Sequence, residues 1–300
     1  MPFLPRIFDF NSSSSDESTE SQNPDKQQPS MILEYRIRLP MTVDEHKIAR
    51  LYAISRSSKT ETGGGEGIEY VENIPFTGSD EHDLPDGFNS GQFTRKKIHL
   101  SEKLPAFVRY LTPNDYLDVD EKSWNAYPYC KTDITNNFMN DDFMYRIETY
   151  HFDADDGTRE NAHNLPADEL KRREVIHLDI ADNSLIDAQD YKPDEDPNIY
   201  KSAKTGRGPL QNGWEESCET MCVYKLVSIR FKWWGLQNRA EQILKRVTTR
   251  IFLAFFRRLH CWTDEWTDLT MEEVRQFEAE TKQQLDEIRQ SGAVQGTMEQ

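Results

Sequence analysis

The chain has 300 residues, of which 36% are hydrophobic and 11% aromatic, and this is enough to form one large domain or two small ones. Its formal net charge of −17, from 53 acidic and 36 basic side chains, argues against a surface that as a whole binds nucleic acid or an anionic membrane. The 4 cysteines are too few for a disulfide framework and lack the paired spacing of a zinc site, so we expect no metal and a reducing, cytoplasmic environment.

The N-terminal segment predicts neither a targeting signal nor folded structure. MPFLPRIF lacks the charged start and apolar stretch of a secretory signal, and no apolar run in the chain approaches the ~18 residues of a membrane span. Residues 11–30 are mostly Ser, Asp, Glu, Gln and Pro, which cannot offset the entropy cost of ordering. We therefore predict a disordered extension over residues 1–30 and a single folded domain over residues 31–300.

The start of the folded part predicts a strand and then a helix. Apolar and polar residues alternate over residues 33–39, and Pro40 ends the pattern. The sequence Thr42-Val-Asp-Glu45 is a capping box that opens an apolar helical stripe. The glycine-rich run over residues 63–67 is not followed by Lys-Ser/Thr, so we interpret it as a turn and not as a phosphate-binding loop.

Polar residues then occur on strand faces that are otherwise apolar. In the predicted strand over residues 92–100, Thr94 and Lys96 share a face with Ile98. Extended segments are predicted over residues 124–135, 143–152 and 174–180, and Thr149 in the second shares a face with Ile147. Antiparallel strands with inward polar residues suggest a curved sheet around a cavity whose floor carries chemistry.

A loop without periodicity spans about residues 182–212. It contains Ser202 between Lys201 and Lys204, in a context accessible in principle to a kinase. Because basic residues near a serine are common by chance, this signal for a phosphosite is weak.

The most informative strand covers residues 223–231. Its apolar face carries a single charge, Lys225, and it runs into Trp233, Trp234 and Gly235. Paired tryptophans beside a breaker suit a membrane interface, where the indole places its ring in lipid and its N–H among headgroups, although both rings could equally be core residues.

Two helices are predicted after this strand. The first, over about residues 236–262, has an apolar stripe that includes Ile251 and Phe255, and a basic surface that either faces a membrane or pairs with acidic neighbours. The second, over about residues 271–290, starts with the capping box Thr270-Met-Glu-Glu273 and places Glu278 on its inward stripe. A carboxylate there is costly unless it is paired or bound to a polar group.

Several segments in order along the chain resemble the class I phosphatidylinositol transfer proteins, which have a START-like fold. They are GGGEG (63–67), KSWNAYPYCKT (122–132), KSAKTGRGPL (201–210), FKWWGLQN (231–238) and WTDLTMEEVRQFEAETKQQLDE (266–287). The resemblance extends from Met31 to about Arg289. It implies an α+β helix-grip fold, in which a curved, mainly antiparallel sheet and helices enclose a cavity for one phospholipid.

The resemblance also implies roles for individual residues. Contacts with the inositol ring are expected from Thr94, Lys96, Asn125 and Glu278. Positions near the headgroup or phosphate are expected for Thr132, Thr149, Lys225 and Glu121. In addition, Cys130 is expected close to the lipid, Trp233 and Trp234 at the membrane, and Ser202 at the position of a regulatory serine. Family members often carry Gln where this chain has Arg50, which either adds a phosphate contact or obstructs one.

The function implied is transfer or exchange of phosphatidylinositol and phosphatidylcholine between membranes. We expect a cytoplasmic monomer with transient membrane contact, no nucleic-acid partner, no catalytic residues, and no cofactor other than the phospholipid cargo. A sensor that presents phosphatidylinositol to a lipid kinase is the alternative. A lipid-hydrolysing enzyme is less favoured, since the sequence lacks a G-x-S-x-G elbow and an H-E-x-x-H helix.

Overall fold

The computed structural model describes residues 28–60, 62, 67–78, 83–99, 118–188, 190–232, 235 and 237–290. The strands of this part are β1 (Met31–Leu39), β2 (Gly67–Thr77), β3 (Ser90–His99), β4 (Val119–Ala126), β5 (Tyr129–Thr135), β6 (Phe143–Phe152), β7 (Glu174–Leu178) and β8 (Met221–Phe231). The α-helices are α1 (Val43–Thr60), α3 (Ala167–Arg172), α4 (Gln237–Cys261), α5 (Thr263–Trp266) and α6 (Met271–Gln290). Short 3-10 turns lie at Asn140–Asp142, Asn183–Leu185, Pro193–Glu195 and Trp214–Glu216.

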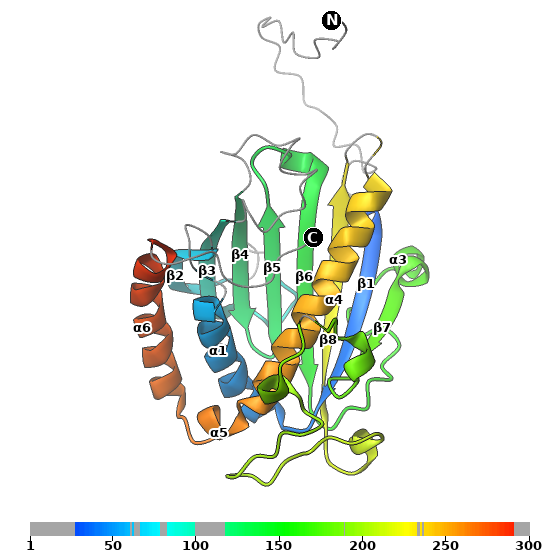
Figure 1. Ribbon diagram of the computed structural model, residues 1–300. Helices are drawn as coiled ribbons and strands as arrows, with labels where there is room; N and C mark the ends of the chain where they lie inside the picture. Colours follow the sequence, from blue (N-terminus) through cyan, green and yellow to red (C-terminus); the bar gives the residue numbers. More distant parts are fainter. Residues whose placement is uncertain are drawn as a thin grey trace, which may run out of the picture.

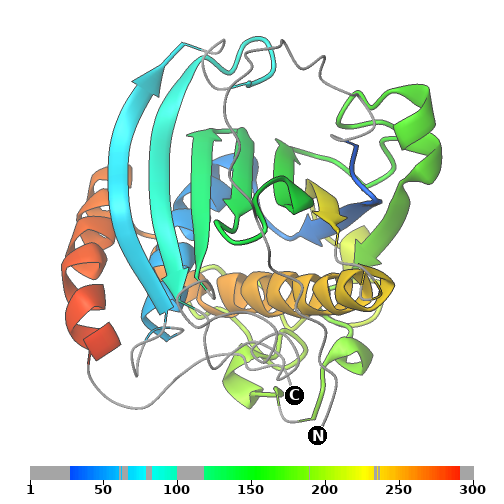
Figure 2. The same cartoon turned by 90° about the horizontal axis from the view of Figure 1, so that it is seen from above.

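All the strands belong to one sheet, in the order β2-β3-β4-β5-β6-β8-β1-β7. Neighbouring strands are antiparallel, except that β1 and β7 are parallel. The sheet is strongly curved (Figure 2). Helices α1, α4 and α6 lie across one face of it, and α4 crosses the strands obliquely (Figure 1). The predicted α+β fold with a curved, mainly antiparallel sheet and helices over it is confirmed.

The core lies between the sheet and α4, and we call the sheet face that α4 covers the inner face. The alternation in β1 places Tyr35 on this face, where its ring meets Phe252 edge-on with centroids 5.1 Å apart. The Tyr145 hydroxyl on β6 lies 2.6 Å from the Thr248 hydroxyl of α4. Burial of each large apolar side chain here contributes about 1.5–3 kcal/mol, and this packing holds α4 on the sheet.

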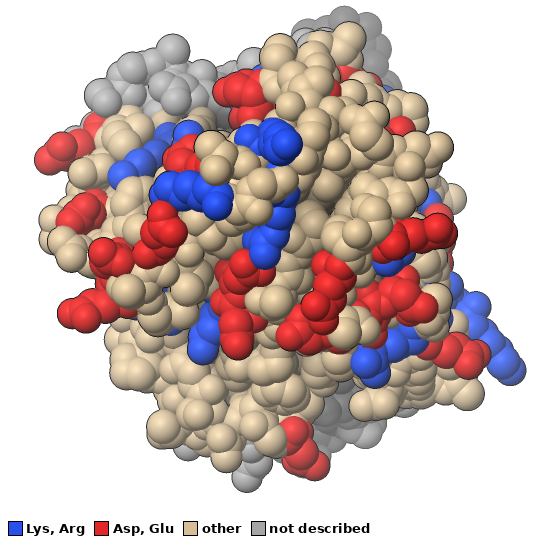
Figure 3. All heavy atoms as spheres, turned by 90° about the horizontal axis from the view of Figure 1, so that it is seen from below, with Lys and Arg blue, Asp and Glu red and all other residues tan. Residues whose placement is uncertain are grey.

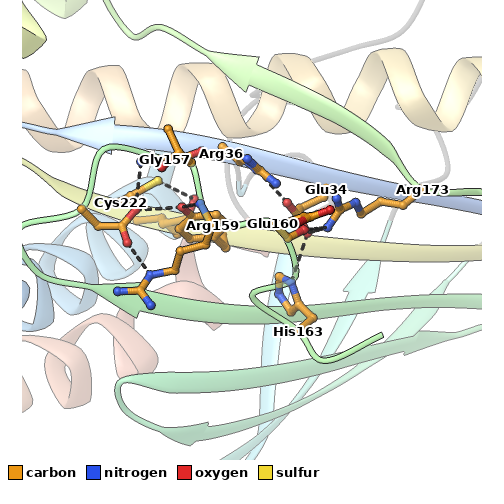
Figure 4. Close-up of polar contacts among 12 residues, drawn as sticks. Glu34, Arg36, Gly157, Arg159, Glu160, His163, Arg173 and Cys222 are labelled. Atoms are coloured by element: carbon orange, nitrogen blue, oxygen red, sulfur yellow. Dashed lines mark hydrogen bonds and ion pairs between the residues drawn. The ribbon is translucent and has the colours of Figure 1, made fainter. Parts of the chain in front are cut away.

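The outer face of β1 is covered by the chain between β6 and β7, and charged groups meet there (Figure 4). Glu34 is fully buried, and its carboxylate accepts hydrogen bonds of 2.7 Å from both Arg36 and Arg173. The His163 Nδ1 atom lies 3.5 Å from the same carboxylate. Burial alone would raise the pKa of Glu34, but the hydrogen bonds from His163 and Arg36 and the charge of Arg173 outweigh it and lower that pKa.

Both predicted capping boxes form. The Thr42 amide donates to the Glu45 carboxylate at 2.8 Å, and the Glu45 amide donates back to the Thr42 hydroxyl at 3.2 Å. Thr270 and Glu273 make the same pair of bonds at 2.8 and 3.3 Å. These reciprocal bonds explain why α1 and α6 begin where the sequence indicates.

Two expectations need correction, and one open alternative is decided. The extended segment predicted over residues 124–135 is a hairpin, since Tyr127 and Pro128 form a turn between β4 and β5 and a proline cannot donate to a sheet ladder. The inward stripe predicted for α4 is wrong at Ile251, which is 50% exposed, whereas Phe255 packs against the core as predicted and Phe252 and Phe256 are buried. Much of the basic surface of α4 is paired with acidic neighbours, which is the second of the two interpretations given above for this surface.

These ion pairs join α4 to the acidic loops beside it. Lys245 binds Glu174 at 2.6 Å, Arg250 binds Asp190 at 2.7 Å, Arg258 binds Glu195 at 2.9 Å and Arg257 binds Asp196 at 3.1 Å. Seen from below, the molecule carries acidic side chains across the middle of its surface with basic ones between them (Figure 3). A surface of this kind does not favour attraction to an anionic membrane.

Some predictions concern residues outside the described part of the chain. They are the extension up to residue 27, the glycine run over residues 63–66, and Trp233 and Trp234. Among the described residues, no helix combines the length and the apolar composition needed to cross a bilayer.

Candidate functional site

The strand register brings the predicted polar residues onto the inner face. One row across the strands reads Asn125, Cys130, Thr149 and Lys225, each paired with the next. A second row pairs Thr94 with Ser123 and Ser123 with Thr132, and a third pairs Lys96 with Glu121. Paired residues share a face, and rows two residues apart lie on the same side, so the residues of the three rows form a continuous polar area.

A pocket opens beside this area, between α6 and the strands β2 and β3. Its volume is about 570 Å³, within the ~300–1,000 Å³ typical of small-molecule sites. Its lining consists of Asn73, Gln92, Arg275, Glu278, Ala279, Lys282 and Gln283. The Glu278 carboxylate accepts a 2.7 Å bond from Arg275, and the Asn73 amide oxygen accepts bonds from Gln92 at 2.7 Å and from Thr94 at 3.3 Å.

Lys96 is a further cation, on β3 next to this pocket. Its Nζ atom lies 3.3 Å from the Glu121 carboxylate and 5.0 Å from the centre of the Tyr70 ring. Burial disfavours its charge, but Glu121, with smaller contributions from Tyr70 and Glu278, outweighs burial and raises the pKa of Lys96. The ammonium group therefore stays charged and pairs with Glu121.

Hydroxyl, amide and thiol groups continue the polar area across β4 and β5. The Ser123 and Thr132 hydroxyls lie 3.0 Å apart, and Ser123 also lies 3.3 Å from Glu121. The Cys130 thiol donates to the Asn125 amide oxygen at 3.2 Å. Together these side chains offer donors and acceptors to a ligand with several hydroxyl groups.

A second group of side chains lies where α1 meets the same sheet face, and we call it the cation cluster: Lys225 and His151 from the sheet, and Arg50 and His46 from α1. Lys225 donates to the Thr149 hydroxyl at 3.3 Å and lies over the rings of Phe252 and Phe256, at 5.0 and 6.0 Å from their centres. Arg50 lies over the Tyr127 ring at 5.8 Å, and its Nε and Nη2 atoms are shielded from solvent without a hydrogen-bond partner in the described part of the chain.

Burial governs protonation in the cation cluster. It lowers the pKa of Lys225 to about 8, and the charge of Arg50 adds to the effect. Burial, followed by neighbouring positive groups that include Arg50 and Lys225, also holds the pKa of His46 and of His151 well below the usual value. Two cations and two neutral imidazoles therefore face one another.

The environment of Ser202 differs from the expectation. The residue is only 1% exposed, its hydroxyl is hydrogen-bonded to the Asp264 carboxylate, and it accepts a 2.9 Å bond from the Thr205 amide. The prediction that this serine is accessible is wrong for this conformation, since a kinase would require the loop to open.

Sequence reasoning missed several residues of the site. Ser123 was recoverable, because it continues the alternation between Glu121 and Asn125. His46, Tyr127 and His151 come together only through packing of α1 on the sheet, with His46 and His151 ring centres 4.8 Å apart, and no local pattern indicates this contact.

Comparisons with known proteins identify the family of this chain. A family model described as phosphatidylinositol transfer protein matches residues 30–283. The phosphatidylinositol transfer protein beta isoform of Bos taurus is 47% identical over 273 residues, which cover 89% of this chain and 97% of that protein. Phosphatidylinositol transfer protein 5 of Dictyostelium discoideum is 44% identical over 257 residues, 85% of this chain and 86% of the relative.

Proposed function

The chain belongs to the phosphatidylinositol transfer protein family, and on that premise we propose that it binds one phospholipid and carries phosphatidylinositol and phosphatidylcholine between membranes. The phospholipid is cargo, and the protein needs no catalytic residue and no other cofactor. It acts as a cytoplasmic monomer that contacts membranes transiently. The observation that carries the proposal is the inner-face polar area beside the pocket of α6.

Recognition of the inositol ring follows from the mixture of donors and acceptors in the pocket region. Lys96 donates, Glu121 and Glu278 accept, and the Thr94 hydroxyl and the Asn125 amide can do either. An inositol ring with its hydroxyl groups matches such a surface, whereas a choline group leaves it unpaired. Each unpaired buried polar group costs about 1–3 kcal/mol, which favours phosphatidylinositol.

The phosphate belongs beside Lys225 and Thr149. Among the residues that the structure describes, Lys225 makes one polar contact, with the Thr149 hydroxyl, so an ammonium hydrogen remains for a phosphate oxygen. Thr132 and Cys130 lie on β5, between β4 and β6. In this proposal their side chains line the space between the inositol ring and the phosphate.

Exchange at the membrane completes the cycle. Transfer through water exposes the acyl chains at a cost of ~0.8 kcal/mol per CH₂, and an enclosed cavity removes most of that cost. Trp233 and Trp234 supply the membrane contact in this proposal, because an inserted indole ring gives reversible anchoring.

Transfer of labelled phosphatidylinositol and phosphatidylcholine between vesicles tests the proposal. Thr94→Ala should reduce phosphatidylinositol transfer about tenfold and leave phosphatidylcholine transfer nearly unchanged, while Thr135→Ala, at an exposed position on β5, serves as the matched control. Equal loss of both lipids in Thr94→Ala would instead indicate misfolding. Unchanged transfer by Trp233→Ala/Trp234→Ala would contradict the docking role.

A further inference from the structure

A β-bulge in β2 brings Asn73 onto the inner face of the sheet. In the register with β3, Tyr70 pairs with Lys96 and Asn73 pairs with Thr94, so β2 advances by three residues while β3 advances by two. Without this extra residue, the strand period of two would place Tyr70 and Asn73 on opposite faces. Bulges that re-aim a side chain in this way are common next to functional sites. The irregularity therefore lets both side chains face the polar area.

The exposure of the side chains along β2 agrees with this arrangement. Tyr70 and Asn73 are partly buried, whereas Val71 and Glu72 between them are exposed. The helix α6 lies beside β2 at this edge of the sheet (Figure 1), and the pocket between them is lined by Asn73 from the strand and by Glu278 from the helix. Asn73 therefore lies at the same end of the inner face as the residues expected to contact the inositol ring.

The Asn73 amide oxygen organises two neighbouring side chains on β3. It accepts a hydrogen bond of 2.7 Å from the Gln92 amide nitrogen and one of 3.3 Å from the Thr94 hydroxyl. The short bond from Gln92 fixes which way the Asn73 amide points, because its oxygen must face the donor. A hydroxyl has a single proton, and the second bond directs the proton of Thr94 toward Asn73. The lone pairs of the Thr94 oxygen remain for a ligand, so this threonine acts as an acceptor.

An oriented acceptor at Thr94 matters for the choice of headgroup. The hydroxyl groups of an inositol ring can donate to it, whereas the choline of phosphatidylcholine carries no O–H or N–H donor. If the Thr94 hydroxyl rotated freely, a bound inositol ring would have to order it. A group that the folded protein already holds in its bound orientation avoids that cost. The bond to Asn73 therefore favours phosphatidylinositol over phosphatidylcholine.

We propose that Asn73 is a positioning residue for the selection of phosphatidylinositol, and that it acts by holding the Thr94 hydroxyl with its lone pairs toward the inositol ring. The bulge in β2 places Asn73 for this role, and Gln92 orients its amide. The proposal rests on the proposed function, because it concerns recognition of the headgroup of the same cargo.

The test measures transfer of labelled phosphatidylinositol and phosphatidylcholine between vesicles for each variant. Asn73→Ala removes the acceptor and should lower the ratio of phosphatidylinositol to phosphatidylcholine transfer about fivefold, as expected for the loss of one neutral hydrogen bond. Asn73→Asp keeps an oxygen acceptor and should retain the ratio of wild type. Glu72→Ala is the matched control, since Glu72 is the exposed neighbour on the same strand. If Asn73→Ala does not fold, Asn73→Leu removes the acceptor while it keeps a side chain of similar shape.

A double variant shows whether Asn73 acts through Thr94. Asn73→Ala/Thr94→Ala should have the same transfer ratio as Thr94→Ala alone, because no hydroxyl remains for Asn73 to orient. A ratio that falls by the product of the two single effects would overturn the positioning role, as would equal losses in Asn73→Asp and Asn73→Ala.

The outcomes also separate this inference from the function on which it rests. Selective loss of phosphatidylinositol transfer in Thr94→Ala, together with an unchanged ratio in Asn73→Ala, overturns the role of Asn73 alone. Wild type that transfers no phosphatidylinositol overturns the proposed function and this inference with it.

Discussion

Lys225 should destabilise the protein when the lipid is absent. Its pKa of about 8 in the folded state lies below the ~10.4 of an unfolded lysine, and each unit corresponds to ~1.4 kcal/mol, so the buried charge costs at most ~3 kcal/mol. The side chain retains partial exposure, which reduces the cost, and the variant Lys225→Met loses the bond to Thr149. We expect Lys225→Met to stabilise lipid-free protein by about 1–2 kcal/mol at pH 7.

The effect has a defined dependence on pH. Below pH 8 both states hold the proton and the full cost is present, whereas between pH 8 and ~10.4 the unfolded chain binds more protons and the stability of wild type rises with pH. The advantage of Lys225→Met should therefore shrink over this range. With a phospholipid bound, the phosphate neutralises Lys225, and the variant should gain less stability from the lipid than wild type gains.

Denaturant unfolding of lipid-free and lipid-loaded protein at pH 7 and pH 10 measures these differences. Lys97→Met is the matched control, because Lys97 neighbours Lys96 on β3 but is 44% exposed and pairs with Asp118 at 3.4 Å. The reasoning is refuted if Lys225→Met is no more stable than wild type at pH 7 without lipid, or if its advantage is the same at pH 10.

Three further changes test other parts of the structure. Glu34→Gln leaves buried cations unpaired and should cost about 3 kcal/mol of stability at pH 7. Since the pKa of Glu34 is lowered, the difference in melting temperature from wild type should be full above pH ~4.3 and should vanish as the pH falls further. A difference that stays constant across the pH series would contradict this assignment. Gly91→Ala places a Cβ atom in steric conflict with the Asn125 carbonyl oxygen. Calorimetry should therefore show a loss of about 1–3 kcal/mol in the free energy of unfolding, and phosphatidylinositol transfer should fall. An unchanged melting temperature would mean that β3 can move to accommodate the methyl group. Ser202→Ala removes the hydroxyl bonded to Asp264 and should cost about 1 kcal/mol of stability, measured by denaturant unfolding. Protease should also cleave the 201–210 loop faster in this variant, because the bond to Asp264 holds the loop closed. Equal cleavage of the variant and wild type would contradict that role of the bond.

The sequence predicts the sheet side of the site better than the helix side. The inward positions of Thr94, Lys96 and Lys225 follow from the strand period of two, which burial enforces strictly because a shift by one residue reverses the face. On a helix, neighbouring residues lie about 100° apart, and within the apolar run over residues 251–256 the three- and four-residue spacing placed Ile251 inward, whereas Phe252 is buried. The tertiary contact of α4 with β1 and β6 selects Phe252.

The cation cluster shows what local pattern cannot predict. Among the described residues, the Arg50 Nε and Nη2 atoms have no hydrogen-bond partner, and this depends on how α1 packs against the rest of the fold. Likewise, Ser202 lies in a sequence typical of an exposed loop, and its burial depends on Asp264, which is 62 residues away. Contacts between distant segments therefore had to come from the structure.

The three polar rows of the inner face restrict how the length of this chain can change during evolution. Deletion of one residue within β4 would bring Lys122 and Trp124 onto the ligand face and send Ser123 and Asn125 to the outside, and β3 and β5 would face the same exchange. Insertions and deletions should therefore accumulate between strands and be absent within β3 to β6. Relatives that differ in lipid preference are expected to differ by substitution at these fixed positions and not by a change in strand length.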